Sequence, residues 1–336
     1  MSDSVTTHAV VFTAENRAEL VPTTVPAPSA GEVRVRTLRS CVSPGTELRI
    51  LSGKENGFAG WPTAGGYALC GEIESVGDDV DLDIGTPVVL QRSKHEANTP
   101  HGSHIGYALA PTSDCVVVPD GVSAEAAALS RVMSIGHRGA RQAFPQIGES
   151  VALVGLGLIG LSAALTATLT GARVACFNRS TDRVEMARAC GLEAHAVDGE
   201  LADVITRVLP GGADVLIDAT GSPATPAAAI PAVRELGWSD GDRGHARYVM
   251  LGSYNGDMPI PYFPAFHREL TVQFPRYTDN LDVAEVLRLL ARGAVNVGPV
   301  LRGAAFSPTD ANDAYAALRD RKRGLMTAVF DWTALA

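Results

Sequence analysis

The chain has 336 residues, of which 46% are hydrophobic, and a formal net charge of −9 at pH 7. This length exceeds the size at which one hydrophobic core stops growing, so two domains are expected. No apolar run approaches the ~20 residues needed to cross a bilayer, and the acidic balance disfavours a nucleic-acid or anionic-membrane partner. The first residues lack a basic segment followed by an apolar core, so no secretory signal is predicted and a cytoplasmic protein is expected.

Short strands separated by turn residues are predicted over roughly the first 120 residues. His8–Phe12 is an apolar run, and Gly31–Arg39 alternates apolar and basic residues as a half-buried antiparallel strand does. Pro22, Pro26 and Pro28 indicate an irregular connection between these strands. Further strands are predicted at Gly71–Val76, Pro87–Leu90, Tyr107–Ala110 and Asp114–Pro119. This part of the chain is expected to be a barrel-like β module.

From Ser123 the pattern changes to helices alternating with strands. Ser123 is a good helix cap, and helix formers continue to about Phe144. The alternation that follows covers Val151–Val154, Leu161–Leu169, Arg173–Phe177, Thr181–Ala189, Leu201–Leu209, Asp214–Asp218, Thr225–Leu236 and Arg247–Leu251. Such alternation builds a doubly wound parallel sheet with helices on both faces, so an α/β protein is predicted.

The last part of the chain is expected to return to the first module. Its predicted elements are a strand at Leu270–Phe274, helices at Asn280–Arg292 and Thr309–Arg319, and a closing strand at Leu325–Phe330. The predicted domains are therefore residues 1–122 with 274–336, and an inserted domain of residues 123–273. An edge strand at Gly256–Pro261 is expected to favour a homodimer, although its prolines limit strand pairing.

A glycine-spaced turn stands between the strand at Val151 and the following helix. Gly155 permits the tight turn, Gly157 lets the backbone approach a pyrophosphate, and Gly160 lets the helix lie close to the strand. Leu158 and Ile159 open the helix, whose free N–H groups attract phosphate. The pattern predicts a dinucleotide site.

The end of the next strand indicates which dinucleotide binds. Asn178 stands where an acidic residue would hold the ribose hydroxyls of NAD, and Arg179 follows it. Asn178 does not repel a 2′-phosphate, and Arg179, Ser180 and Arg183 are able to bind one. NADP(H) is predicted, with NAD as the alternative if Arg179 is only a solvated loop residue.

The order of these segments resembles the medium-chain dehydrogenase/reductase superfamily. The supporting stretches are Gly71–Gly77, Asp214–Gly221 and Val249–Ser253. The resemblance implies a GroES-like catalytic domain beside a Rossmann domain, and hydride transfer between a nicotinamide and a carbonyl, an alcohol or an activated alkene. It also implies that the cofactor cleft is lined by Ala219, Thr220, Gly221, Gly252 and Ser253.

The chain departs from the zinc-dependent members of that superfamily. Pro44, Tyr67 and Arg131 stand at the places of the three catalytic-zinc ligands, and proline cannot bind a metal. The region of the structural zinc contains no cysteine, and His95, His101 and His104 are interpreted as loop residues. No metal site is therefore predicted. The segments around Ser43 and Tyr67 resemble the zinc-independent branch that includes the bacteriochlorophyllide dehydrogenase type.

Without zinc, an organic side chain must serve the substrate oxygen. Tyr67 is the first candidate, Ser43 and Thr46 are candidate relays, and His137 is a candidate acid or base. Each has a structural alternative: Tyr67 fills the space of the metal, Ser43 and Thr46 bond to backbone, and His137 is a core residue.

A structural alternative also exists for Glu47, which is expected to bind Arg131 or Arg49. The predicted function is a zinc-independent NADP(H)-dependent oxidoreductase that acts on the hydroxyl or keto group of a small polar molecule. An alkene or quinone reductase and a non-catalytic nucleotide-binding protein are the alternatives.

Overall fold

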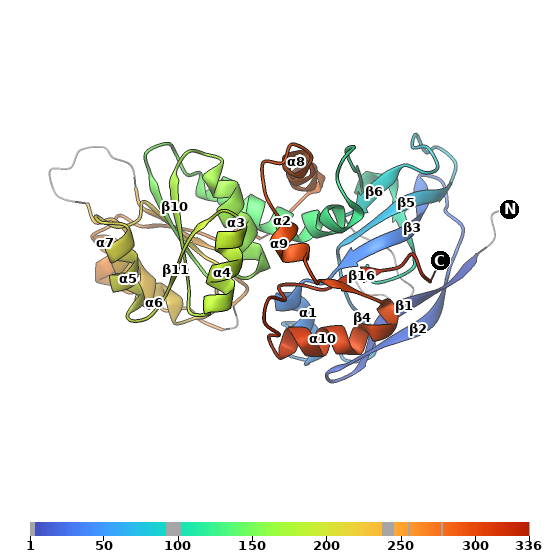
Figure 1. Cartoon of the computed structure of the whole chain (residues 1–336), viewed down its shortest axis with the longest axis horizontal. Helices are drawn as coiled ribbons and strands as arrows, with labels where there is room; N and C mark the ends of the chain where they lie inside the picture. The colour runs from blue at the N-terminus through green and yellow to red at the C-terminus, as the bar shows by residue number, and fades with distance from the viewer. Residues whose placement is uncertain (1–3, 92–101, 237–244, 255, 277, 336) are drawn as a thin grey trace. The chain divides into compact units, whose positions relative to one another are not determined.

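The structure, a computed structural model, describes residues 4–91, 102–236, 245–254, 256–276 and 278–335 (Figure 1). The chain divides into two compact units: unit 1 comprises Met1–Val132 and Asp279–Ala336, and unit 2 comprises Met133–Thr278. The first changeover falls inside the helix α2 (Ala124–Ala143), ten residues beyond the predicted boundary. A continuous helix carries the chain from one unit to the other, which a change in composition cannot reveal.

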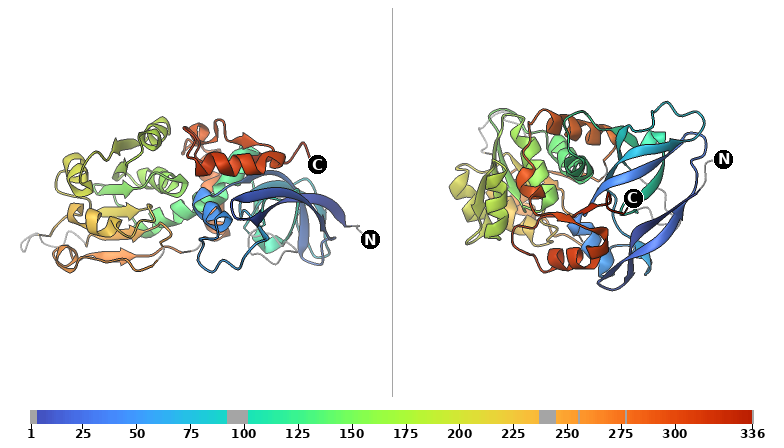
Figure 2. Two further views of the ribbon diagram at one scale, coloured as in Figure 1. Left: turned by 90° about the horizontal axis from the view of Figure 1, so that it is seen from below. Right: turned by 45° about the vertical axis from the view of Figure 1, so that its right-hand side comes forward.

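Unit 1 is built mainly of short antiparallel strands in two sheets (Figures 1 and 2). The smaller sheet has the order β2-β1-β4, and the larger has the order β15-β16-β3-β5-β6-β8, with β7 also paired to β3. The strands are β1 (Val5–Ala14), β2 (Arg17–Val25), β3 (Glu32–Cys41), β4 (Thr63–Ala64), β5 (Leu69–Val76), β6 (Pro87–Leu90), β7 (Tyr107–Pro111), β8 (Cys115–Val117), β15 (Ala305–Phe306) and β16 (Val329–Asp331).

The irregular connection predicted from Pro22, Pro26 and Pro28 is wrong, because β2 runs through Pro22 and pairs with β1 from Val25 to Arg17. Strand β2 is at the edge of its sheet. Pro22 has no N–H group to donate, and an edge strand tolerates this because its outer side pairs with no further strand. The prolines Pro26 and Pro28 only follow the strand.

The basic residues of β3 are held by ion pairs on neighbouring elements. Arg34 is 4% exposed and its Nε lies 2.7 Å from Glu74 Oε2 on β5. Arg39 bonds Glu125 at 2.7 Å and Asp331 at 2.6 Å. The apolar face of the same strand, with Val33 and Val35 fully buried, belongs to the core between the sheets. The alternation of apolar and basic residues thus marks two packed faces.

The C-terminal segment completes unit 1. Its helices are α8 (Asn280–Ala291), α9 (Gly298–Leu301) and α10 (Ala311–Arg319), and β16 then pairs antiparallel with β3, with Val329 opposite Cys41. The right-hand view of Figure 2 shows this red segment returning to the blue strands. The rings of Phe12 and Tyr315 meet edge to face at 5.1 Å in a core that also contains Trp332. The C-terminus therefore contributes core residues to the N-terminal sheets.

Unit 2 is a six-stranded parallel sheet of order β11-β10-β9-β12-β13-β14. Counted along the chain, this is the doubly wound order 3-2-1-4-5-6, so the predicted Rossmann fold is confirmed. Its strands are β9 (Ser150–Val154), β10 (Arg173–Asn178), β11 (Glu193–Ala196), β12 (Val215–Asp218), β13 (Arg247–Met250) and β14 (Thr271–Gln273).

Helices cover both faces of this sheet (Figure 1). Helices α3 (Leu158–Thr168) and α4 (Thr181–Ala189) pack against β9 to β11. Helices α5 (Leu201–Val208), α6 (Thr225–Ala229) and α7 (Tyr262–Phe266) lie toward the other side, with the 3₁₀ turn Ile230–Ala232 between α6 and α7 along the chain. No described helix is long and apolar enough to span a bilayer.

Two predictions for unit 2 are wrong. The helix expected over Thr225–Leu236 ends as α6 and a 3₁₀ turn, because Pro231 has no N–H group with which to continue the α-helical ladder. Residues Gly256–Pro261 form no strand, and their two prolines again remove ladder donors. Pairing of this segment with a second copy is not tested by the single chain, so the homodimer stays a prediction.

Candidate functional site

The glycine turn of unit 2 adopts the geometry that the sequence predicted. Gly155 has φ 97°, and Gly157 caps α3 with φ −73° and ψ 179°. A Cβ atom on Gly160 would lie 2.0 Å from the Gly155 carbonyl oxygen, whereas one on Gly157 would meet nothing within 4 Å. The turn is thus tightly packed beneath Gly160 and open beside Gly157. An anion is able to reach the N–H groups at the start of α3 there.

Asn178 at the end of β10 fastens this turn. Its Oδ1 accepts a hydrogen bond from the Leu156 N–H at 3.1 Å, and its Nδ2 donates to the Ser180 carbonyl oxygen at 3.4 Å. The sequence suggested a cofactor role for Asn178, and the structure adds a role in shaping the turn.

Basic residues follow Asn178 at the same end of β10. Arg179 and Ser180 are exposed, and Arg183 in the first turn of α4 is partly buried. No hydrogen bond or ion pair to Arg179 occurs within the described part of the chain. Its guanidinium is therefore available to an anion.

The loops after β12 and β13 lie beside the glycine turn. The Ala219 N–H donates to the Val154 carbonyl at 2.8 Å, and a Cβ on Gly155 would meet the Thr220 nitrogen at 2.9 Å. Gly221 has φ 67°, and a Cβ on Gly252 would lie 2.5 Å from the Gly221 nitrogen. The turn and these loops thus meet at the C-terminal ends of β9 and β12, where the strand order reverses and nucleotides bind in such sheets.

A buried carboxylate organises the loop after β12. Asp218 is fully buried, and its Oδ1 accepts from the Thr220 N–H at 2.9 Å and from the Thr220 hydroxyl at 2.7 Å. Its Oδ2 accepts from the Tyr248 hydroxyl at 2.9 Å. Burial, followed by the charge of Asp218, raises the pKa of Tyr248, so this hydroxyl remains a donor. Sequence analysis did not single out either residue.

The corresponding loop of unit 1 begins with a helix that the sequence analysis missed. Helix α1 (Pro44–Leu51) has Ser43 as its N-cap and proline at its first position, a pair that favours a helix start. Glu47 is 1% exposed, and its Oε1 accepts from the Ser43 N–H at 2.6 Å. Its Oε2 lies 2.9 Å from His104 Nε2 and accepts a short hydrogen bond from the Tyr315 hydroxyl.

One prediction is wrong here. Glu47 does not pair with Arg131 or Arg49; its bonds go to the three groups just named, and Arg49 pairs with Glu55 at 2.5 Å. His104 lies in the loop before β7, as predicted, but it is only 1% exposed and bonds Glu47 through one ring nitrogen. His95 and His101 lie outside the described residues.

Tyr67 is linked to the start of α1. Its hydroxyl donates to Ser43 Oγ at 2.6 Å, and the guanidinium carbon of Arg131 lies 5.3 Å from the centre of its ring. Burial raises the pKa of Tyr67 to about 12, while the Ser43 hydrogen bond and the Arg131 charge act in the opposite direction. The structure thus brings two candidates, Tyr67 and Ser43, into direct contact and supplies a neutral phenol flanked by a cation.

The other two candidates are placed differently. Thr46 is partly buried in the first turn of α1 and is not the residue that bonds Tyr67. His137 is 6% exposed on α2, and its Nδ1 lies 3.4 Å from Thr166 Oγ1 on α3, so it takes part in packing within unit 2.

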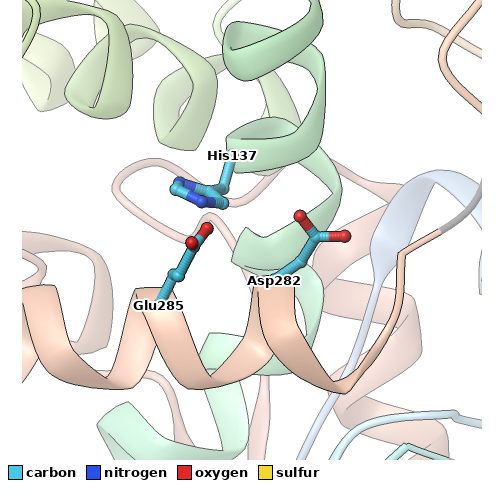
Figure 3. A group of neighbouring side chains, drawn as sticks. All are labelled: His137, Asp282 and Glu285. Carbon is cyan, nitrogen blue, oxygen red and sulfur yellow. The ribbon is translucent and has the colours of Figure 1, made fainter.

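Figure 3 draws His137 on α2 and two carboxylates, Asp282 and Glu285, on α8. Asp282 has a structural role, because it forms a capping box with Asp279 at the start of α8. Within either unit taken alone, the described residues assemble no three His, Cys, Asp or Glu side chains whose ligand atoms lie within 4.8 Å of one another.

A doubly wound sheet with a glycine turn at its switch point defines a dinucleotide-binding unit, and the β-rich unit contains a half-buried tyrosine bonded to a buried serine. Comparison with known proteins agrees. Residues 159–292 match the zinc-binding dehydrogenase family. The chain is 28% identical over 305 residues to L-galactonate-5-dehydrogenase from Escherichia coli K12. The matched region covers 82% of this chain and 85% of that protein.

Solved structures show the same fold over almost the whole chain. A short chain alcohol dehydrogenase from Escherichia coli CFT073, complexed with NADH, has a TM-score of 0.83 at 18% identity and covers 97% of this chain and 99% of that one. A protein from Sinorhizobium meliloti 1021 bound to NADP has a TM-score of 0.80 at 20% identity, with coverage of 97% and 99%. Together these similarities support the medium-chain dehydrogenase/reductase superfamily and an enzyme of the NAD(P)-dependent alcohol dehydrogenase type.

Two glycines of the turn should respond differently to alanine. Gly160→Ala should lower the free energy of unfolding by about 1–3 kcal/mol, because its Cβ overlaps backbone. Gly157→Ala should cost less than about 1 kcal/mol and should instead weaken cofactor binding, since its methyl group occupies the open space. Chemical denaturation and a cofactor titration measure the two effects, and equal stability losses would contradict this geometry.

Tyr67 should resist ionisation. The tyrosinate absorbance that is lost in Tyr67→Phe should appear only as the pH nears about 12, because burial keeps the folded-state pKa above the ordinary value of 10.0. The unfolded chain releases this proton first, so the contribution of Tyr67 to stability is complete below pH 10.0 and is lost as the pH rises toward 12. A spectrophotometric difference titration measures it, and ionisation at the ordinary value would contradict the burial of the phenol.

Proposed function

We propose that this protein is an oxidoreductase that transfers hydride between NADP(H) and the hydroxyl or keto group of a small polar molecule, without a zinc ion. The observation that carries the proposal is the Tyr67 phenol, which is held by Ser43 and flanked by Arg131. L-Galactonate-5-dehydrogenase, the relative compared above, is named for a small polyhydroxy acid, which supports a small polar substrate.

Unit 2 supplies the residues that fit a dinucleotide. The open space beside Gly157 and the start of α3 suit a pyrophosphate, and the exposed Arg179 suits a 2′-phosphate. Ser180 and the partly buried Arg183 follow at the start of α4 and add polar groups. When bound, the nicotinamide supplies or accepts the hydride.

Unit 1 supplies the group that serves the substrate oxygen. The Tyr67 hydroxyl is protonated at neutral pH and donates a hydrogen bond, so it is suited to stabilise an alkoxide or to protonate it. The Arg131 guanidinium over the ring stabilises the tyrosinate that forms when the proton leaves. The phenol has one proton, which it donates to Ser43 Oγ at 2.6 Å in the structure; when that proton turns to the substrate oxygen, the Ser43 hydroxyl is placed to donate a hydrogen bond to the phenol oxygen instead.

The residues at this place do not fit zinc. Pro44 has no donor atom, the Tyr67 phenol holds its proton up to a pKa of about 12, and Arg131 brings a positive charge. A zinc ion needs deprotonated or neutral ligands, and a neighbouring cation repels it. The proposed reaction therefore uses no metal.

Tyr67→Phe should lower kcat at least tenfold with little change in the dissociation constant of the cofactor, because only the donor to the substrate oxygen is removed. Tyr107→Phe on β7 is the matched control, since no hydrogen bond to its hydroxyl occurs among the described residues. Steady-state rates on a panel of alcohols, ketones, enones and quinones provide the measurement. A rate unchanged by Tyr67→Phe would exclude Tyr67 as the acid, and NADPH binding without turnover of any substrate would favour a non-catalytic protein.

Arg179→Ala should weaken NADPH binding by roughly ten- to a hundredfold while NADH binding changes little, because a charge-assisted bond is worth ~1.5–3 kcal/mol. Arg173→Ala, at the opposite end of β10, removes the same charge and should leave the preference between the two cofactors unchanged. Fluorescence titration with each cofactor measures the preference. An equal loss for NADPH and NADH in Arg179→Ala would exclude this arginine as the 2′-phosphate site.

A further inference from the structure

Unit 1 contains a buried network of polar side chains that do not act directly in the proposed reaction. It consists of five side chains that are each at most 1% exposed, namely Ser40, Glu47, His104, Tyr315 and Trp332. They come from β3, α1, the segment before β7, α10 and the residue after β16. Polar groups buried so completely are expensive unless every one is bonded.

We propose that Glu47 and His104 are positioning residues, which fix Ser43 and through it the hydroxyl of Tyr67. The inference rests on the proposed function, because Tyr67 is there the donor to the substrate oxygen. Neither residue is proposed to touch the substrate or the cofactor.

Glu47 holds Ser43 by its backbone. Its Oε1 accepts from the Ser43 N–H at 2.6 Å, while its Oε2 is fixed by the Tyr315 hydroxyl and by His104 Nε2 at 2.9 Å. Three donors to one carboxylate compensate for its burial and leave it a single orientation. Ser43, held in this way, accepts a hydrogen bond at its Oγ from the Tyr67 hydroxyl at 2.6 Å.

His104 supports the Tyr67 side of the contact between Tyr67 and Ser43. A Cβ atom on Gly66 would lie 2.6 Å from the His104 ring, so the residue next to Tyr67 packs directly on the imidazole. The Ser103 N–H also donates to the Gly66 carbonyl at 3.3 Å. The His104 segment thus contacts both Glu47 and the chain that carries Tyr67.

The network continues from His104 to the C-terminal segment. Trp332 Nε1 donates to Ser40 Oγ at 2.8 Å, and Ser40 Oγ lies 2.7 Å from His104 Nδ1. With the Ser40 hydroxyl as donor to Nδ1 and Nε2 as donor to Glu47, every donor of the network has an acceptor. The network ends at the indole N–H, so it fixes geometry and does not conduct protons.

Glu47→Gln tests the proposal. The amide has only one acceptor oxygen for three donors, so Ser43 loses its fixed position, and kcat should fall roughly tenfold while the dissociation constant of NADPH stays unchanged. Added to Tyr67→Phe, the same substitution should change kcat less than about twofold, because residues that act through one another are not additive. Two losses that multiply in the double variant would overturn the proposal.

Asp214→Asn is the matched control for Glu47→Gln. The Asp214 carboxylate also accepts several hydrogen bonds, from the Ser150 N–H at 2.9 Å and from Arg234 at 2.5 Å, and it lies at the N-terminal ends of β9 and β12, opposite the ends that carry the glycine turn. It should lower the thermal midpoint with kcat unchanged. If Glu47→Gln does not fold, Tyr315→Phe replaces it, since this variant removes only one donor to Glu47. A kcat loss in Tyr315→Phe that multiplies with the loss in Tyr67→Phe would again overturn the proposal.

A second readout needs no substrate. In thermal unfolding without ligands, the midpoint shifts of Glu47→Gln and Tyr67→Phe should be smaller together than their sum, because both loosen the same Ser43 contact. Additive shifts would overturn the positioning role even if Tyr67→Phe proved inactive. Non-additive shifts with an unchanged rate in Tyr67→Phe would keep the positioning role and reject only the proposed function of Tyr67.

Discussion

A carboxylate removed from water must receive hydrogen bonds, and each unit of this protein is built around one such group. In unit 1 Glu47 accepts from a backbone N–H and from Tyr315, and it is bonded to His104. In unit 2 Asp218 accepts from a backbone N–H, from the hydroxyl of Thr220 and from Tyr248. Both carboxylates accept from a tyrosine, because a buried phenol stays protonated and remains a donor. Removing one donor would leave the buried charge with two partners and less compensation for its burial.

The hydrogen bonds around Glu47 and those around Asp218, here called the Glu47 cage and the Asp218 cage, each hold a binding or catalytic element in place. The Asp218 cage fixes the loop that packs against Gly155, so the open side of the glycine turn keeps its shape. The Glu47 cage fixes Ser43, which receives the phenol of Tyr67. A rigid support of this kind is what a binding or catalytic group needs, because small displacements of a reacting group are costly in rate.

The chain as a whole joins distant segments to build unit 1. Tyr315 and Trp332, from the end of the sequence, complete the network that begins at Ser40 and Glu47. The C-terminal return is therefore part of the candidate site as well as of the core. Unit 2, by contrast, forms its nucleotide edge from one continuous stretch of alternating strands and helices.

The sequence by itself determined the features that depend on neighbours along the chain. The glycine turn, the parallel sheet and most strands were predicted, because periodicity and the freedom of Gly155 at positive φ are local properties. Pro44 and Tyr67 likewise marked an unusual site. Tertiary structure alone decided the partners of Glu47 and the burial of His104, since these two residues are far apart in the sequence and no local pattern couples them. It also decided that Pro22 belongs to an edge strand, because an edge exists only once a sheet has formed.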